Sequence, residues 1–264
     1  MDPRAGVGQA AAMREPARRG DVAPAPAHPE RHRHYRYYDL MLGGFVTVLL
    51  CSNLIGPGKS CQLVLPGIGH VVFGAGNLFF PISYIFGDVL TEVYGYARAR
   101  KVIWAGFAAM LFATVMSQVV IRMPVDPAEP FNAVMQPALE VCFGGTWRIV
   151  AGSIAAFWVG DFVNSFVLAK MKILTRGRWL WTRTIGSTIA GQLVDSVVFY
   201  PIAFAGIWTA ETLLQVVAFN WFFKVMVEAA MTPVTYLVVG WLKRAEAEDF
   251  YDVDTDFTPF SLAD

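Results

Sequence analysis

Residues 149–169 read IVAGSIAAFWVGDFVNSFVLA, a run of 21 residues that contains one charged side chain, Asp161. A helix needs about 20 mostly apolar residues to cross a bilayer core about 30 Å thick. Similar stretches recur along the chain, so the sequence predicts an all-α, polytopic membrane protein with about six transmembrane helices. The predicted spans are residues 38–55, 73–94, 102–120, 149–169, 185–207 and 213–241.

The composition also indicates a membrane protein. Of the 264 residues, 55% are hydrophobic and 16% are charged, whereas about a quarter of the residues in a soluble domain are charged. The charged residues gather at the two ends of the chain and in the short connectors. The formal net charge is zero, which argues against a large nucleic-acid-binding surface.

Lysine and arginine follow an alternating pattern along the predicted connectors. Cytoplasmic connectors of membrane proteins are enriched in these residues. Every second connector, counted with the two ends, is basic, and the basic set holds 13 residues against 3 in the others. Six spans with both termini in the cytoplasm predict this pattern. The basic set is Arg31, Arg33, Arg36, Arg98, Arg100, Lys101, Lys170, Lys172, Arg176, Arg178, Arg183, Lys243 and Arg244.

Three regions are expected. Residues 1–36 are rich in Ala, Pro and Arg and lack the apolar core of a secretory signal, so they are expected to form a disordered basic tail. Residues 37–244 form the six-helix membrane domain, and residues 245–264 form an acidic cytoplasmic tail. Pro81 predicts a kink in the second span. Residues 56–72 hold too many Gly and Pro to span, and both a loop and a re-entrant segment are considered.

Several polar side chains fall inside the predicted spans. An ionisable group near the bilayer centre costs roughly 2.5–3.5 kcal/mol, so such groups face one another or a water-filled cavity. The sequence therefore predicts a central polar site, and the alternative is a set of buried structural contacts in which Lys224 neutralises Glu228. The polar residues are Asn77, Asp88, Glu92, Asp161, Asn164, Ser165, Gln192, Asp195, Ser196, Asn220, Lys224 and Glu228.

Enzyme and cofactor motifs are missing from the sequence. It contains neither H-E-x-x-H nor G-x-S-x-G. Gly58-Lys59-Ser60 resembles the end of a P-loop, but Asn53 stands where the first glycine belongs. We therefore expect no enzyme activity, no cofactor, no metal site and no built-in ATPase.

Residues 80–95, FPISYIFGDVLTEVYG, resemble the queuosine precursor transporter family, whose members carry a similar F-P-x-x-Y-x-x-x-D-x-x-x-E-V-Y-G block. Four later blocks agree with the family: RIVAGSIA at 148–155, GDFVNS at 160–165, RTIGSTIAGQLVDSVVF at 183–199, and the last span from Pro233. The resemblance covers roughly residues 38–253 and leaves out the N-terminal tail.

This resemblance implies a multi-pass transporter of the bacterial inner membrane. The implied substrates are nucleobase-like small molecules, the cyano- and aminomethyl-deazaguanine precursors of the tRNA nucleoside queuosine. Membrane lipid is the other expected partner. A homodimer is considered because many small transporters form dimers.

The deazaguanine edge suggests roles for the polar residues. A carboxylate can accept hydrogen bonds from the ring N–H and the exocyclic amine together, and aromatic faces can stack on the base. Asp195 and Asp88 are the first candidates, with Asn164 and Gln192 setting orientation and Tyr200 as a further aromatic. The full set of predicted substrate-binding residues is Asp88, Asp161, Asn164, Gln192, Asp195, Asn77, Phe80, Tyr84 and Phe199.

A second group of residues is assigned to gating or coupling. Glu92 and Arg98 are expected to form an inner gate, because Glu92 stands just before a basic turn. Lys224 and Glu228 lie four residues apart on the last span, and a buried carboxylate could couple proton movement to transport.

Other classes of protein fit parts of the sequence. The nearest alternative is the substrate-capture subunit of an energy-coupling-factor vitamin importer, which depends on ATPase partners. A membrane-embedded enzyme would use the acidic residues as acid and base, but no nucleophile or metal set supports it. A structural scaffold is disfavoured by the carboxylates inside the spans.

Overall fold

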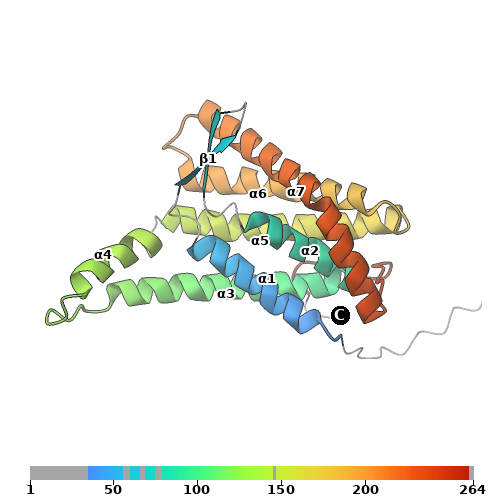
Figure 1. Ribbon diagram of the computed structural model, residues 1–264, viewed down its shortest axis with the longest axis horizontal. Helices are drawn as coiled ribbons and strands as arrows, with labels where there is room; N and C mark the ends of the chain where they lie inside the picture. Colours follow the sequence, from blue (N-terminus) through green and yellow to red (C-terminus); the bar gives the residue numbers. More distant parts are fainter. Residues whose placement is uncertain (1–34, 56–59, 66–68, 75–78, 145–146, 262–264) are drawn as a thin grey trace, which may run out of the picture. The chain divides into compact units, whose positions relative to one another are not determined.

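The computed structural model describes residues 35–55, 60–65, 69–74, 79–144 and 147–261, and helices make up most of this length. Residues 35–264 form one compact unit, in which the helices lie side by side as a bundle (Figure 1). The elements are α1 (Tyr38–Leu54), β1 (Ser60–Leu65), β2 (Gly69–Gly74), α2 (Phe80–Tyr94), α3 (Tyr96–Arg122), α4 (Asn132–Phe143), α5 (Trp147–Leu174), α6 (Leu180–Phe204) and α7 (Ala210–Glu246).

Helices α3, α5, α6 and α7 are long and apolar enough to cross a membrane. Helices α1 and α2 have 17 and 15 residues, which correspond to about 26 and 22 Å at 1.5 Å per residue. Each of these six helices corresponds to one predicted span. The prediction of an all-α, multi-pass membrane protein is confirmed, with α1 and α2 shorter than a full crossing.

The predicted start of the second span, at residue 73, is wrong. Phe73 belongs to strand β2, and α2 begins at Phe80. Pro81 lies in the first turn of α2, where a missing N–H leaves no helical hydrogen bond unmade. Pro81 therefore starts the helix and does not kink it.

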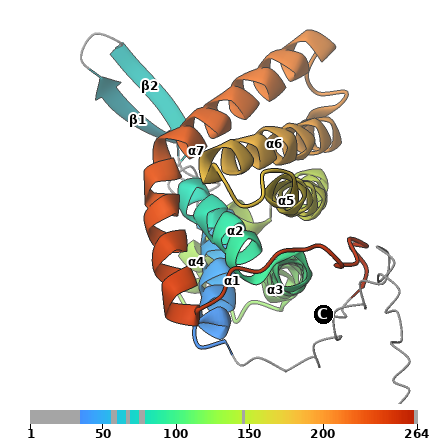
Figure 2. The same ribbon diagram turned by 90° about the vertical axis from the view of Figure 1, so that its right-hand side faces the viewer.

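The segment between α1 and α2 contains an antiparallel hairpin of β1 and β2. Ser60 pairs with Gly74 and Leu65 with Gly69. Figure 2 shows the hairpin projecting from the helices beside α7. For the described part of residues 56–72, the hairpin replaces the expected loop or re-entrant segment.

The described ends of the chain lie together at one end of the bundle. The backbone N–H groups of Arg36 and Tyr37 donate to the carboxylate of Glu246 at 3.0 and 2.7 Å. The Tyr38 hydroxyl donates to the Arg98 carbonyl at the start of α3. Both described ends therefore face the side that carries the basic connectors, as an even number of crossings requires. The charge bias assigns this side to the cytoplasm.

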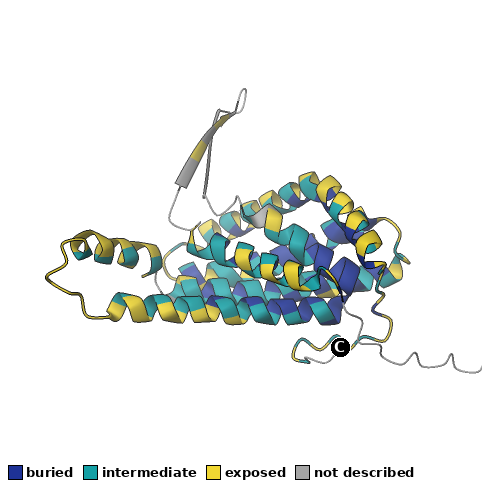
Figure 3. Ribbon diagram, turned by 60° about the horizontal axis from the view of Figure 1, so that its bottom comes forward, coloured by how far each residue is buried: buried dark blue, intermediate teal, exposed yellow. Residues whose placement is uncertain are grey.

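Buried residues concentrate at this basic end of the bundle (Figure 3). Elsewhere, large apolar side chains point outward, among them Phe112, Phe219 and Leu237 with exposed fractions of 67%, 68% and 74%. Large apolar side chains exposed in such number would not suit a soluble monomer. Along membrane-spanning helices these side chains meet lipid.

Two glycines set the distance between α5 and α6. A Cβ on Gly191 would lie 2.8 Å from the Asn164 Cβ and 3.0 Å from the Gly160 carbonyl oxygen, and a Cβ on Gly160 would lie 3.0 Å from the Asp195 Cβ. Small residues at such positions let helix backbones approach closely in lipid. The crossing thereby places Asn164 against Gly191 and Asp195 against Gly160, one helical turn apart.

Gly191→Leu is expected to destabilise the protein by about 1–3 kcal/mol, because the added side chain meets backbone atoms that cannot move aside. Thermal unfolding of the purified protein in detergent measures the effect. Gly240→Leu is the matched control, since nothing lies within 4 Å of a Cβ at Gly240. Equal melting temperatures for the two variants would contradict the close crossing.

Candidate functional site

Hydrogen bonds link polar side chains of α2 to those of α5 and α6 in the middle of the bundle. The Tyr84 hydroxyl donates to the Gln192 side-chain carbonyl at 3.1 Å. The Asn164 amide donates to the Asp88 carboxylate, also at 3.1 Å. Asp88 is 1% exposed. Side chains that the sequence places on separate spans therefore lie in contact.

An ion pair joins α7 to α6 in the same region. The Lys224 ammonium group lies 2.5 Å from the Asp195 carboxylate, and both side chains are partly exposed. Asp161 of α5 is near enough to both to interact electrostatically, and Tyr200 lies near Asp195. Lys224 thus pairs across helices with Asp195, in place of the predicted pairing with Glu228 along α7.

Several buried oxygen atoms here have no hydrogen-bond donor among the residues that the structure describes. They are one oxygen of Asp88, both carboxylate oxygens of Glu228, the side-chain carbonyl of Asn164 and the Ser196 hydroxyl. A buried polar group without a partner costs roughly 1–3 kcal/mol. Such a cluster in a membrane protein points to a bound water, ligand or proton at these atoms.

A small cavity of about 10 Å³ lies against the polar face of α5. This volume is close to the least that holds one water molecule, whereas ligand pockets usually measure about 300–1,000 Å³. This cavity is therefore too small to hold a base. The cavity is lined by Phe45, Gly87, Leu90, Ala99, Val102, Ile103, Asp161, Asn164 and Ser165.

The remaining predicted binding residues are placed only in part. Asn77 and the side chain of Phe80 lie outside the described residues. The ring of Phe199 packs against Tyr200 and Phe204 at centroid distances of 5.0 and 6.1 Å. A role for Phe199 in stacking on a base stays a prediction.

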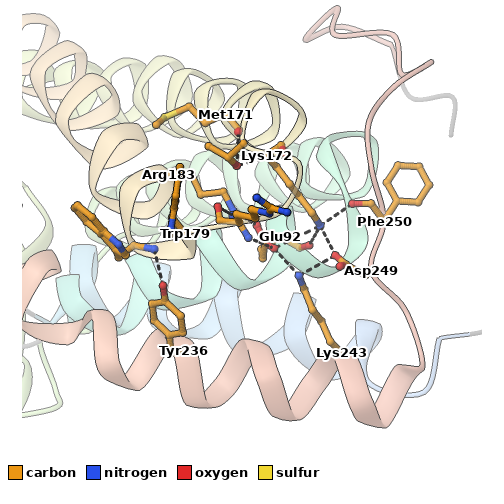
Figure 4. Close-up of polar contacts among 12 residues, drawn as sticks. Glu92, Met171, Lys172, Trp179, Arg183, Tyr236, Lys243, Asp249 and Phe250 are labelled. Atoms are coloured by element: carbon orange, nitrogen blue, oxygen red, sulfur yellow. Dashed lines mark hydrogen bonds and ion pairs between the residues drawn. The ribbon is translucent and has the colours of Figure 1, made fainter.

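Glu92 is the centre of a second polar cluster, at the basic end of the bundle (Figure 4). Its side chain is fully buried. The Arg183 guanidinium donates from two nitrogens to the two carboxylate oxygens of Glu92, each at 2.7 Å. Such two-point contacts are strong and directional, so α2 and α6 are held in one relative orientation.

Two lysines and a second carboxylate complete this cluster. Lys243 lies 2.5 Å from a Glu92 oxygen and 2.8 Å from Asp249. Lys172 donates to the Glu92 backbone carbonyl at 2.5 Å and lies 2.6 Å from Asp249. The cluster joins α2, α5, α6, α7 and the segment after α7 through three cations and two carboxylates.

Arg98, the predicted gate partner of Glu92, makes other contacts. Its guanidinium donates to the Tyr94 carbonyl at 3.3 Å and lies over the rings of Tyr35 and Phe250 at 4.7 and 5.7 Å. The direct pairing of Glu92 with Arg98 is therefore not formed. Sequence reasoning had placed Lys172, Arg183 and Lys243 in connectors. Of these three residues, only Arg183 belongs to a sequence motif, the R-x-x-x-S-T block at 183–188.

Residues 247–261, called the C-terminal strap here, run from the end of α7 across α3 (Figure 2). The Asp252 carboxylate accepts the Tyr96 backbone N–H at 2.9 Å. This contact caps the start of α3, where backbone donors have no helical partner. The Arg100 guanidinium donates to the carbonyls of Asp256 and Thr258 at 2.7 and 2.6 Å. The acidic segment is thus bound to the helices along its length.

Comparison with known proteins places the chain in a family. A family profile described as "Putative vitamin uptake transporter" matches residues 74–238. A Bacillus subtilis protein named "Probable queuosine precursor transporter" is 34% identical over 73% of this chain and 80% of its own length. The chain belongs to the queuosine precursor transporter family. This transporter is also 26% identical to the Escherichia coli "Queuosine precursor transporter", over 60% of this chain and 67% of the relative.

A Haemophilus influenzae protein, also named "Probable queuosine precursor transporter", is 27% identical over 62% of this chain. No solved structure matches this chain. The names of the relatives confirm the prediction of a transport protein and not an enzyme. Among the described residues, no group of three or more His, Cys, Asp or Glu is placed to hold a metal ion.

Glu92→Gln is expected to lower stability by about 3–5 kcal/mol, because it leaves buried cations without their carboxylate. Unfolding of the purified protein in detergent measures this loss. Arg244→Gln serves as the control, since Arg244 makes an exposed contact to the Gly240 carbonyl. If Glu92→Gln unfolds like the control, the cluster does not hold the helices together.

Asp249 gives the cluster a pH dependence. Its partial burial favours the neutral form, but hydrogen bonds from Lys172 and Lys243 outweigh this effect and lower the pKa of Asp249 below its usual 3.8. A carboxyl group whose pKa is lower in the folded than in the unfolded protein stabilises the fold at pH values above the unfolded-state pKa. This stabilisation is lost as the pH falls through the folded-state pKa. Asp249→Asn should therefore melt below the wild type at pH 7, and the gap in melting temperature should narrow as the pH falls below 3.8. A gap that stays constant across this range would contradict the assignment.

Proposed function

We propose that this transporter imports the cyano- and aminomethyl-deazaguanine precursors of queuosine across the bacterial inner membrane. The names of the relatives in Bacillus subtilis and Escherichia coli support the substrate class. The apolar helices support a multi-pass location in the membrane. The inner membrane and the two precursors are those that the family resemblance implies.

The observation that carries the proposal is the meeting of four helices at one polar region. Tyr84, Asp161, Asp195 and Lys224 come from α2, α5, α6 and α7, and they are close enough to interact. A flat base with hydrogen-bond donors on one edge and a carbonyl on another needs such surroundings. Binding sites for small molecules are built this way, with a few convergent polar groups among apolar walls.

We assign the donor edge of the base to Asp161. Asp195 is engaged by Lys224 and Asp88 accepts from Asn164, whereas Asp161 is one of the residues that line the cavity. A carboxylate there can accept the ring N–H and the exocyclic amine side by side. Gln192 and Lys224 can donate to the ring carbonyl, and Tyr84 offers an aromatic face.

The cavity beside Asp161 must widen before it can hold a base. The Glu92 cluster then acts as the cytoplasmic barrier, because its ion pairs cross four helices. An import cycle opens the outer side first and the Glu92 cluster second. Ion pairs suit this barrier, since the separated groups can be hydrated when water enters.

Expression in a bacterium that lacks both precursor synthesis and its own importer tests the proposal. With precursor supplied at low concentration, the chain expressed alone should restore queuosine in tRNA, measured by mass spectrometry of the nucleosides. Restoration that needs added ATPase subunits would identify a capture subunit instead. No restoration under either condition would refute queuosine precursor transport.

Asp161→Asn should reduce uptake of labelled precursor by roughly 10- to 150-fold at low concentration, the equivalent of about 1.5–3 kcal/mol for hydrogen bonds to a charged group. Asp126→Asn is the control, because Asp126 lies exposed in the connector between α3 and α4. Uptake by Asp161→Asn at the control rate would remove Asp161 from the site.

A further inference from the structure

Two carboxyl groups meet in the interior away from every cation of the cluster around Glu92. Asp88 of α2 and Glu228 of α7 are 1% and 0% exposed. Their carboxyl groups lie within hydrogen-bonding reach of each other. Three of their four oxygen atoms have no hydrogen-bond donor among the described residues, and the fourth accepts from Asn164.

Ionised carboxylates carry no hydrogen to donate. A contact between two of them is repulsive, and burial without partners makes an ionised carboxylate still less favourable. The same contact becomes a strong hydrogen bond when one proton lies between the oxygens, as in the paired aspartates of some proteases. The geometry of Asp88 and Glu228 therefore calls for a bound proton.

The charged neighbours do not supply an alternative partner. Glu92 lies one turn from Asp88 on α2, but Arg183, Lys172 and Lys243 neutralise it. Lys224 lies one turn from Glu228 on α7 and is bound to Asp195.

The other groups that face the pair do not carry a positive charge either. From α2, the Tyr84 hydroxyl donates to Gln192. From α5 come the neutral amide of Asn164 and, further off, the carboxylate of Asp161. A proton is thus the one positive charge available to Asp88 and Glu228 from the described surroundings.

We propose that Asp88 and Glu228 form the proton-binding site of this transporter, separate from the groups that recognise the base, and that the bound proton couples import to the proton gradient. The inference rests on the proposed function and extends it to the driving ion. One proton enters from the outer side, is shared by the two carboxyl groups, and leaves to the cytoplasm in each cycle.

The pair is placed to link the proton to movement of the helices. With the proton bound, α2 and α7 are held together at Asp88 and Glu228. After the proton leaves, two negative charges repel each other across the same contact. The hydrogen bond from Asn164 to Asp88 passes this change to α5, where Asp161 lines the cavity.

Purified full-length protein in liposomes tests the coupling with labelled aminomethyl-deazaguanine. The wild type should accumulate the base when the outside is acidic, and a pH-sensitive dye should report proton entry with the base. Glu228→Gln, which mimics a permanently protonated acid, should lose accumulation and proton entry. It should retain exchange of labelled for unlabelled base, because exchange does not require proton release. Glu211→Gln, at an exposed position on the same helix, should behave as the wild type.

The outcomes separate this inference from the proposed function. A wild type that neither exchanges nor accumulates the base refutes the proposed function. A wild type that exchanges the base but ignores the pH gradient, or follows a sodium gradient instead, overturns the proton site alone. Accumulation retained by both Glu228→Gln and Asp88→Asn overturns it as well. Loss of exchange in both variants would mean that the pair is structural.

Discussion

The arrangement of the helices depends on the ion pairs that the buried carboxylate of Glu92 forms. Apolar side chains gain little from meeting one another in lipid, because the acyl chains are equally apolar. Polar contacts and close packing must therefore decide which helices associate. Glu92 draws Arg183, Lys172 and Lys243 to one point, and this point unites three long helices with α2. The tightest burial in the bundle lies at this end.

The C-terminal strap extends the same junction beyond the membrane helices. Asp249 supplies the second carboxylate for Lys172 and Lys243, while Asp252 caps α3. Phe257 and Phe260 pack against the rings of Tyr96 and Trp104. A separation of the helices at this end must therefore also disturb the strap. The acidic end of the chain is therefore part of the same junction of ion pairs.

The acidic residues of the bundle have different partners. Glu92 is surrounded by cations, Asp195 has one lysine, and Asp161 lines a cavity. Asp88 and Glu228 face each other without a cation. A carboxylate neutralised by arginine is a structural group, whereas one without a counter-charge can bind a donor or a proton. These surroundings are the basis of the proposed roles in barrier, recognition and coupling.

Local composition alone determined the six helices and the common side of the two chain ends. Each helix had to be apolar over its own length, and the lysine and arginine residues in the connectors recorded the direction of each crossing. Asp88, Asp161, Asp195 and Glu228 could be recognised from sequence because charge inside an apolar run is expensive wherever the helix lies.

The partners of these residues were decided only by the tertiary structure. Sequence shows neighbours along one helix, so Lys224 was matched to Glu228 and Glu92 to Arg98, but Lys224 binds Asp195 and Glu92 binds Arg183. Which side chains meet across two helices depends on how each helix is rotated and how closely it approaches. Close helix crossings, such as that of α5 and α6 at Gly160 and Gly191, set this rotation and distance. These crossings bring together residues that are distant in the chain.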